Sequence, residues 1–194
     1  VIVSTVKAIT SNLAAFALSI PSKTDVDIAA LITKLGNSDW VNQGRQYLGG
    51  DGICPFCQKP TIDEIFGEQI AEYFDESYEQ DKEQLIAQQL SYSTFTSSVL
   101  STLDQIEAAE NLKGDSKLDV DTFSAHLKVI HSQHSANKLL IQEKVEKTSQ
   151  QVLLTDTSEE LEAIAELIGS ANESIAAHNR LVDNYDQEVG ALKR

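Results

Sequence analysis

The sequence predicts an all-α protein: an elongated antiparallel coiled coil or helical bundle that carries a small helical head with a CxxC knuckle. Prolines and glycines gather near the start, because Pro21, Pro55 and Pro60 all precede residue 61. Proline disrupts the interior of a helix, so the proline-free remainder favours long helices. Apolar residues also recur at alternating spacings of three and four between residues 161 and 192, which is typical of a coiled coil.

Charge divides the chain at the same place. Residues 1–60 hold five basic and four acidic side chains, whereas residues 61–194 hold ten and twenty-six. We therefore expect two regions, a small helical head with the CPFC knuckle over residues 1–60 and a long-helix coiled-coil hairpin or bundle over residues 61–194.

The head begins with an apolar segment, Ile2 to Ile20, whose interspersed polar residues predict an amphipathic packing helix rather than a membrane span. Short helices are predicted from Val26 to Lys34 and from Asp39 to Leu48, with Ser38 as the cap of the second. The cysteine-containing loop follows.

A long helix is predicted from Ile62 to Leu112, because Thr61 and Glu64 form a capping-box pattern at its start. At ~1.5 Å per residue this helix would be roughly 75 Å long. The apolar pattern stops at residues 113–116, and Asp119 can cap a second helix that runs back. Residues 155–158 carry the start signal of a third helix, while residues 152–154 are expected to be extended.

Three apolar stripes could bury one another. The strongest, on the third helix, comprises Leu161, Ile164, Ile168, Ala171, Ile175, His178, Val182, Tyr185, Val189 and Leu192. The second helix carries Phe123, Leu127, Ile130, His134, Asn137, Ile141 and Lys144, and the first carries Tyr92, Phe95, Val99, Leu103 and Ile106. The aromatic residues Tyr73, Phe74 and Tyr78 are expected to pack against the head.

Composition excludes several function classes. The formal net charge of -15 opposes binding to the anionic surfaces of nucleic acids and membranes. Two cysteines are too few for a secreted disulfide framework, which favours a cytoplasmic location. The sequence contains no G-x-x-x-x-G-K-S/T, G-x-S-x-G or H-E-x-x-H motif, so we do not expect a self-contained enzyme.

Cys54 and Cys57 are candidate zinc ligands, because two thiols on one turn can approach the same tetrahedral ion. They supply half of a site. A second copy of the chain could complete it, or His131 or His134 could contribute from this chain. The alternatives are a reduced, metal-free turn or an incidental disulfide, with a thioredoxin-like redox role less favoured. His134 and His178 occupy positions in the stripes.

The head resembles a known family. Its pattern is Asp39-Trp40-Val41, Gly44, Tyr47-Leu48 and Cys54-Pro55-Phe56-Cys57-Gln58. This pattern is similar to that of bacterial AAA-type, ABC-like ATPases with a coiled-coil insert, the group of the RloC and PrrC anticodon nucleases. The resemblance implies that the chain is the insert, with Trp40, Val41, Gly44, Tyr47 and Leu48 as structural residues of the head.

The resemblance also implies the partners. ATP and Mg²⁺ would bind only in other parts of the parent protein, and the insert would contact the rest of that ATPase. It could form a homodimer through the coiled coil or through a shared zinc ion. The expected function is non-catalytic linkage between the ATPase head and an effector. The alternatives are a zinc-dependent enzyme that uses Cys54, Cys57 and His131 or His134, and a stand-alone scaffold that binds another protein.

Overall fold

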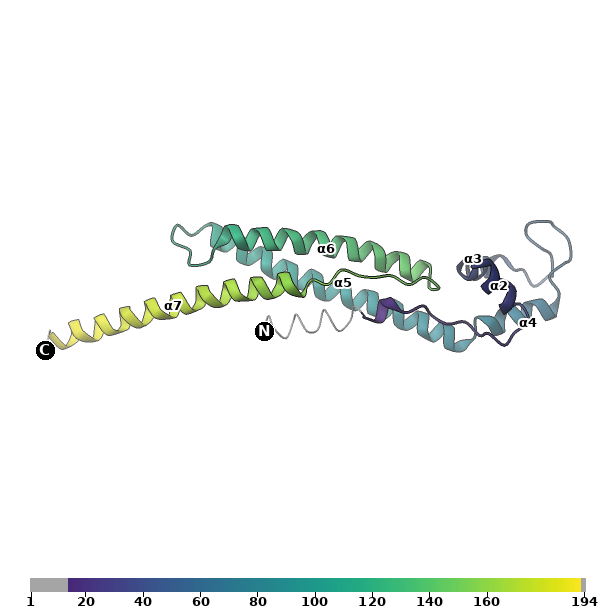
Figure 1. Ribbon diagram of the computed structural model, residues 1–194, viewed down its shortest axis with the longest axis horizontal. Coiled ribbons are helices and arrows are strands. Elements are labelled where there is room, and N and C mark those ends of the chain that lie inside the picture. Colours follow the sequence, from purple (N-terminus) through teal and green to yellow (C-terminus); the bar gives the residue numbers. More distant parts are fainter. Residues whose placement is uncertain (1–13, 193–194) are drawn as a thin grey trace. The chain divides into compact units, whose positions relative to one another are not determined.

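The computed structural model describes residues 14–192 and confirms the all-α prediction. Regular structure in this range consists of helices and short 3-10 turns, apart from one isolated antiparallel bridge between Ile53 and Pro60. The elements are, in chain order, η1 (Ala14–Ala17), α2 (Ala29–Leu35), α3 (Ser38–Gly44), η2 (Arg45–Tyr47), α4 (Glu64–Tyr73), α5 (Glu76–Asn111), α6 (Val120–Glu146) and α7 (Ser158–Leu192) (Figure 1). No helix in the described range is long and apolar enough to cross a membrane.

The chain forms two compact units. One, which we call the head unit, contains residues 14–91 and 139–154. The other, the helical unit, contains residues 92–138 and 155–192 in the described range. Helices α5 and α6 each contribute residues to both units. The predicted boundary at residue 60 stays a prediction.

The predicted N-terminal helix is only partly covered by the structure. Residues 2–13 lie outside the described residues. Residues 14–20 do not form the predicted α-helix, because only the single 3-10 turn η1 is present there. Pro21 disfavours a helical conformation of Ile20, the residue before it. The backbone N–H of Ile20 instead donates to the carbonyl oxygen of Thr148 at 3.0 Å.

The two short helices of the head unit lie close to their predicted positions. Gly36 terminates helix α2. Its φ of 62° lies in the left-handed region, which glycine adopts most easily and which commonly ends helices. The predicted cap of α3 is wrong, because Ser38 is the first helical residue and Asn37 precedes it without a capping hydrogen bond from its side chain. Helix α3 also ends at Gly44, and η2 replaces its last predicted turn.

The predicted helix from Ile62 to Leu112 is broken into α4 and α5. Asp63, rather than Thr61, caps α4 by accepting a hydrogen bond from the backbone N–H of Phe66 at 2.8 Å. The break lies at Phe74 and Asp75. Phe74 leaves the helical conformation and is almost fully buried, while the Asp75 carboxylate accepts from the backbone N–H of Tyr78 at 3.1 Å. A capping acid next to a buried aromatic ring thus starts a new helix.

The core of the head unit confirms the expected packing of the aromatic residues. Tyr73, Phe74 and Tyr78 meet edge to face, with ring centroids 4.8 and 4.9 Å apart in the two successive pairs. They form one apolar cluster with residues of α2 and α4, namely Val26, Ala29, Ile32 and Ile70. This cluster holds α2 and α3 against the junction of α4 and α5.

The helical unit begins with a hairpin. Residues 92–111 of α5 are followed by the predicted turn, and Asp119 caps α6 as expected, because its carboxylate accepts from the backbone N–H of Thr122 at 3.1 Å. Inter-helix polar contacts join α6 to α5 between Ser124 and Glu107 and between His131 and Asp104. His126 pairs with Glu160 of α7.

The predicted stripes differ in how well they are covered. All seven stripe residues of α6 are buried. On α5, Tyr92 and Leu103 are buried, while Phe95, Val99 and Ile106 are half-buried and the neighbouring Thr96 and Leu100 are buried in their place. On α7, the stripe is covered only in its first part: Leu161, Ile164 and Ala171 are buried, but from Ile175 onward it is exposed as far as Tyr185.

Candidate functional site

The candidate site is the cysteine loop, residues 53–60, together with the parts of the head unit that support it. The antiparallel bridge between Ile53 and Pro60 closes the loop. Inside it, the backbone N–H of Cys54 donates to the carbonyl of Lys59 at 2.8 Å, and that of Gln58 donates to the carbonyl of Cys54 at 2.9 Å. Gln58 takes a positive φ of 56°, so the turn after Cys57 is left-handed.

Gly52 fixes where the loop leaves the head. Its φ of 71° is rarely adopted by residues with a side chain, and an added Cβ would lie 2.7 Å from the carbonyl oxygen of Ile62. The backbone N–H of Ile62 donates to the carbonyl of Gly52 at 3.0 Å. Both ends of the loop are therefore held by main-chain contacts that only glycine permits at this position.

The loop lowers the pKa of the Cys54 thiol below its ordinary value. The main cause is hydrogen bonding from the backbone N–H of Cys57, followed by that of Phe56, and partial desolvation opposes the effect. Both cysteines are free thiols; Cys54 is half-buried and Cys57 is exposed. A thiolate is the form that binds metals and attacks electrophiles, so the amide groups prepare Cys54 for either role.

An apolar cavity of about 350 Å³ adjoins the loop. Phe56 of the loop stacks on Trp40 of α3, with the ring centroids 6.1 Å apart and the planes inclined by 25°. The other lining residues are mostly aliphatic or aromatic and include Leu31, Leu35, Leu48, Ile62 and Phe66. The cysteine loop therefore rests on a hydrophobic wall formed by α2, α3 and α4.

Asp39 fastens α3 to the turn that follows α6, residues 147–150. Its carboxylate accepts from the backbone N–H of Ser149 at 3.0 Å and also from the Ser149 hydroxyl. The Thr148 hydroxyl donates to the same carboxylate at 3.4 Å. These contacts connect residues that are 110 positions apart in the sequence.

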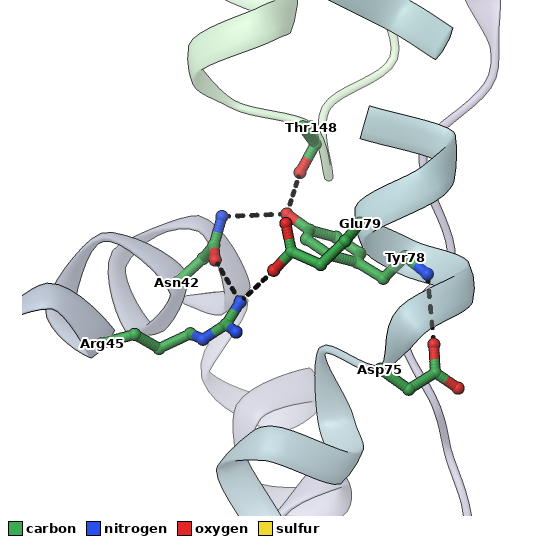
Figure 2. A network of polar contacts seen from close by, with 6 residues as sticks. All are labelled: Asn42, Arg45, Asp75, Tyr78, Glu79 and Thr148. Atoms are coloured by element: carbon green, nitrogen blue, oxygen red, sulfur yellow. Dashed lines mark hydrogen bonds and ion pairs between the residues drawn. The ribbon is translucent and has the colours of Figure 1, made fainter. Parts of the chain in front are cut away.

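A second set of polar contacts surrounds Tyr78, as Figure 2 shows. The hydroxyl groups of Tyr78 and Thr148 lie 2.7 Å apart, and the Asn42 amide donates to the Tyr78 hydroxyl at 2.9 Å. Arg45 donates to Asn42 at 3.1 Å and to Glu79 at 2.6 Å. Burial raises the pKa of Tyr78, so its hydroxyl stays protonated and can donate as well as accept.

Lys144 secures the same turn from inside. Its side chain is fully buried, and the ammonium donates to the carbonyl oxygens of Thr148 at 2.6 Å and Gln150 at 2.5 Å. Burial lowers the pKa of Lys144, while the negative charge of Asp39 acts in the opposite direction. Lys144 thus lies at a position of the apolar stripe of α6, and its ammonium group binds main-chain carbonyl groups of the turn that follows this helix.

Asn137 has the equivalent role in the helical unit. Its buried amide donates to the carbonyl oxygen of Thr155 and accepts from the backbone N–H of the same residue, both at 2.8 Å. Beside it, His134 packs on the Tyr92 ring with the centroids 5.4 Å apart. Burial lowers the pKa of His134, so its neutral form is favoured in the folded protein.

The structure places the predicted metal ligands in both units. Cys54 and Cys57 belong to the head unit, whereas His131 and His134 belong to the helical unit, where His131 contacts Asp104 at 2.8 Å and His134 contacts Tyr92. Within residues 14–192, no group of three or more His, Cys, Asp and Glu side chains is arranged to hold a metal ion.

The predicted structural residues of the head divide by exposure. Val41 and Leu48 pack against the core cluster. Trp40 and Tyr47 remain largely exposed, at 59% and 64%, and Gly44 has open space where a Cβ would lie. Sequence reasoning missed the roles of Asp39, Asn42, Arg45 and Lys144, although Asp39 stands in the pattern that carries the family resemblance.

Comparison with known proteins gives the family. The family model described as AAA domain matches residues 3–194, which is nearly the whole chain. The chain belongs to the AAA domain family. No curated protein and no solved structure gives a significant match. A phosphate-binding G-x-x-x-x-G-K-S/T loop does not occur in the 194 residues of the chain.

Proposed function

We propose that this chain is a non-catalytic helical insertion of an AAA-type ATPase of the RloC and PrrC group, and that it links the ATPase head to an effector. The observation that carries the proposal is the family match over residues 3–194 of a chain whose described part is helical and whose sequence lacks a phosphate loop. Nucleotide and Mg²⁺ would bind elsewhere in the parent protein.

The contacts around the turn at residues 147–150 support a mechanical role. Asp39 and Lys144 hold this turn from two sides, and Tyr78 bonds to Thr148 within it. The turn directly follows α6, while Asp39 belongs to α3. A displacement of the end of α6 would therefore be passed to α3 and to the cysteine loop stacked on Trp40, because packed elements shift as rigid bodies.

The cysteine loop would supply half of a structural zinc site. Structural zinc sites use four ligands, and thiolates are among the commonest. The two cysteines are a type of ligand that zinc prefers, and backbone N–H groups already favour the thiolate form of Cys54. Two cysteines are only half of the four ligands that the site needs. Because Cys57 is exposed, the same pair of cysteines from a second chain could complete the site.

The parentage is tested by extending the reading frame in both directions. We expect a phosphate-loop motif upstream and an ABC signature followed by an acidic strand downstream. A stop codon on either side, with neither motif present, would contradict the insertion and would favour a stand-alone scaffold.

Zinc binding is tested by metal analysis of the purified chain together with sedimentation. We expect one zinc per two chains and a dimer that dissociates when a chelator is added. Replacement of both cysteines by serine should abolish metal binding, and the matched His131→Ala and His134→Ala variants should retain it. Loss of zinc in a histidine variant would instead assign that histidine as a ligand, and no zinc in the unaltered chain would end the proposal.

A further inference from the structure

The second half of α7 carries an apolar stripe that stays exposed. Ile175, Val182 and Tyr185 are 42%, 44% and 66% exposed, whereas Leu161 and Ile164, earlier in the same stripe, are at most 1% exposed. Steps of three and four residues continue through both parts. Residues at these steps lie on one face of a helix, and an apolar face of this kind typically packs against another helix.

Two flanking residues widen the exposed surface. Leu181 is 69% exposed and lies three residues after His178 and four before Tyr185, so the three side chains are neighbours on the surface of the helix. Asn179 is also exposed and flanks the stripe on its other side. The surface therefore has an apolar edge at Leu181 and a polar edge at Asn179.

Charged residues of this part of α7 lie away from the stripe. Glu173, Arg180 and Asp183 are the charged residues between positions 172 and 185. With 3.6 residues per helical turn, Glu173 and Arg180 fall on the face opposite the stripe, and Asp183 lies outside its edges. The stripe and its two edges therefore hold no acidic, lysine or arginine side chain, and they fit an uncharged apolar surface better than a charged helix.

The exposed stripe is self-complementary about residue 180. Its residues form pairs that are equally far from this position, namely Ile175 and Tyr185, His178 and Val182, and Asn179 and Leu181. A two-fold axis through the stripe at residue 180 would set two such helices antiparallel, with Ile175 opposite Tyr185 and Tyr185 opposite Ile175. Leu181 and Asn179 lie on opposite edges, so each of them would meet its own copy.

We propose that the exposed stripe of α7 binds the same stripe of a second copy of this chain, antiparallel, about a two-fold axis at residue 180. The matching stretch from Ile175 to Tyr185 is roughly 15 Å long at ~1.5 Å per residue. So short a pairing buries less surface than a stable dimer needs, and the net charge of -15 on each chain opposes association. The pair is therefore weak and forms only as the concentration rises. It does not depend on zinc, because Cys54 and Cys57 lie in the head unit.

Sedimentation of the full chain with both cysteines replaced by serine tests the association. We expect a monomer at about 10 µM and at least about one third of the chains in dimers at about 500 µM. Leu181→Lys should lower the association constant about tenfold or more, because two lysines would meet across the axis. Asn184→Lys adds the same charge on the far face of α7 and should leave the constant unchanged. A monomer at every concentration, or equal constants in the two variants, would overturn the proposal.

Both variants retain the fold of the chain, because Leu181 and Asn184 are exposed. Circular dichroism of the two variants checks that the helices are unaltered. The comparison between them therefore reports association and not unfolding.

Disulfide formation in the same cysteine-free chain gives the direction of pairing. Leu181→Cys should cross-link to its own copy at least about tenfold faster than Asn184→Cys does. In a mixture of two variants, Ile175→Cys should cross-link to Tyr185→Cys in preference to itself. A preference of Ile175→Cys for its own copy would indicate parallel pairing and would overturn the proposal, as would equal rates for Leu181→Cys and Asn184→Cys.

Ionic strength distinguishes a second copy from a partner of opposite charge. Salt screens the repulsion between two acidic chains, so the association constant should rise when salt is raised from about 50 mM to about 500 mM. A fall of the constant over this range would show that attraction between charges holds the chains together, and it would contradict pairing through the uncharged stripe.

Discussion

Replacement of Asp39 by alanine should loosen the head unit, because the Asp39 carboxylate accepts three hydrogen bonds from the turn at residues 147–150. Hydrogen bonds to a charged group contribute about 1.5–3 kcal/mol each when protected from water. Ser149 lies in an exposed contact, so water replaces part of the loss. We therefore expect the free energy of unfolding of the head unit to fall by about 2–3 kcal/mol.

A double-mutant cycle separates the contact from other effects of Asp39→Ala. The variants are Asp39→Ala, Ser149→Ala and the double variant, with Asp81→Ala on the exposed surface of α5 as the matched control. We expect a coupling energy of about 1–2 kcal/mol between Asp39 and Ser149 and a change within about 0.5 kcal/mol for the control.

Urea denaturation followed by the fluorescence of Trp40 measures this energy in the right place. Trp40 is the single tryptophan of the chain and stacks on Phe56 within the head unit. Far-UV circular dichroism of the same samples reports the long helices separately, which matters because two units need not unfold together. A coupling energy below about 0.3 kcal/mol between Asp39 and Ser149 would refute a stabilising role of this contact.

Three further changes test other contacts. Asn137→Ala should lower the stability of the helical unit by about 2–4 kcal/mol, since both backbone groups of Thr155 lose their buried partner, and unaltered hydrogen-exchange protection at Thr155 would contradict this. His134→Leu should flatten the pH dependence of unfolding. Burial lowers the pKa of His134 in the folded protein, so the unfolded chain binds more protons. The unaltered protein should therefore lose stability as the pH falls below about 6.5. An identical pH profile of unfolding in the variant would argue against this role of His134. Gly52→Ala should disorder the cysteine loop, because the added Cβ would clash with the carbonyl oxygen of Ile62. The fluorescence spectrum of Trp40 reports the loop, since Trp40 stacks on Phe56. A spectrum that does not change in the variant would be inconsistent with this geometry.

The sequence predicted the fold class and the α6 stripe because both depend on local periodicity. All seven predicted stripe positions from Phe123 to Lys144 are buried. The Asp119 cap was equally visible, since an acid at a helix start contacts the backbone only three residues later. Local patterns of this kind leave a direct trace in a single sequence.

The break between α4 and α5 left a weaker trace. Phe74 and Asp75 fit a helical pattern as well as a junction, and the choice depends on the burial of Phe74 beside Tyr73 and Tyr78. That burial becomes possible only when α2 is in place. Tertiary packing therefore overrides local propensity at this point.

The candidate site shows the same division. The spacing of Cys54 and Cys57 identified the loop, because both residues lie on one turn. The contact between Asp39 and Ser149 could not be predicted, since its partners are 110 residues apart and serine after a helix is common in any protein. Lys144 was assigned to the stripe correctly, but its contacts to two carbonyl groups depend on the course of the chain after α6.

Equilibrium binding and hydrolysis of ATP with Mg²⁺ by the purified chain test the central claim most directly. If these helices serve only to connect and position other parts of an AAA-type ATPase, calorimetry should detect no binding at millimolar nucleotide, and phosphate release should equal the uncatalysed background. Saturable binding, or turnover that disappears when the chain is unfolded, would contradict a purely supporting role.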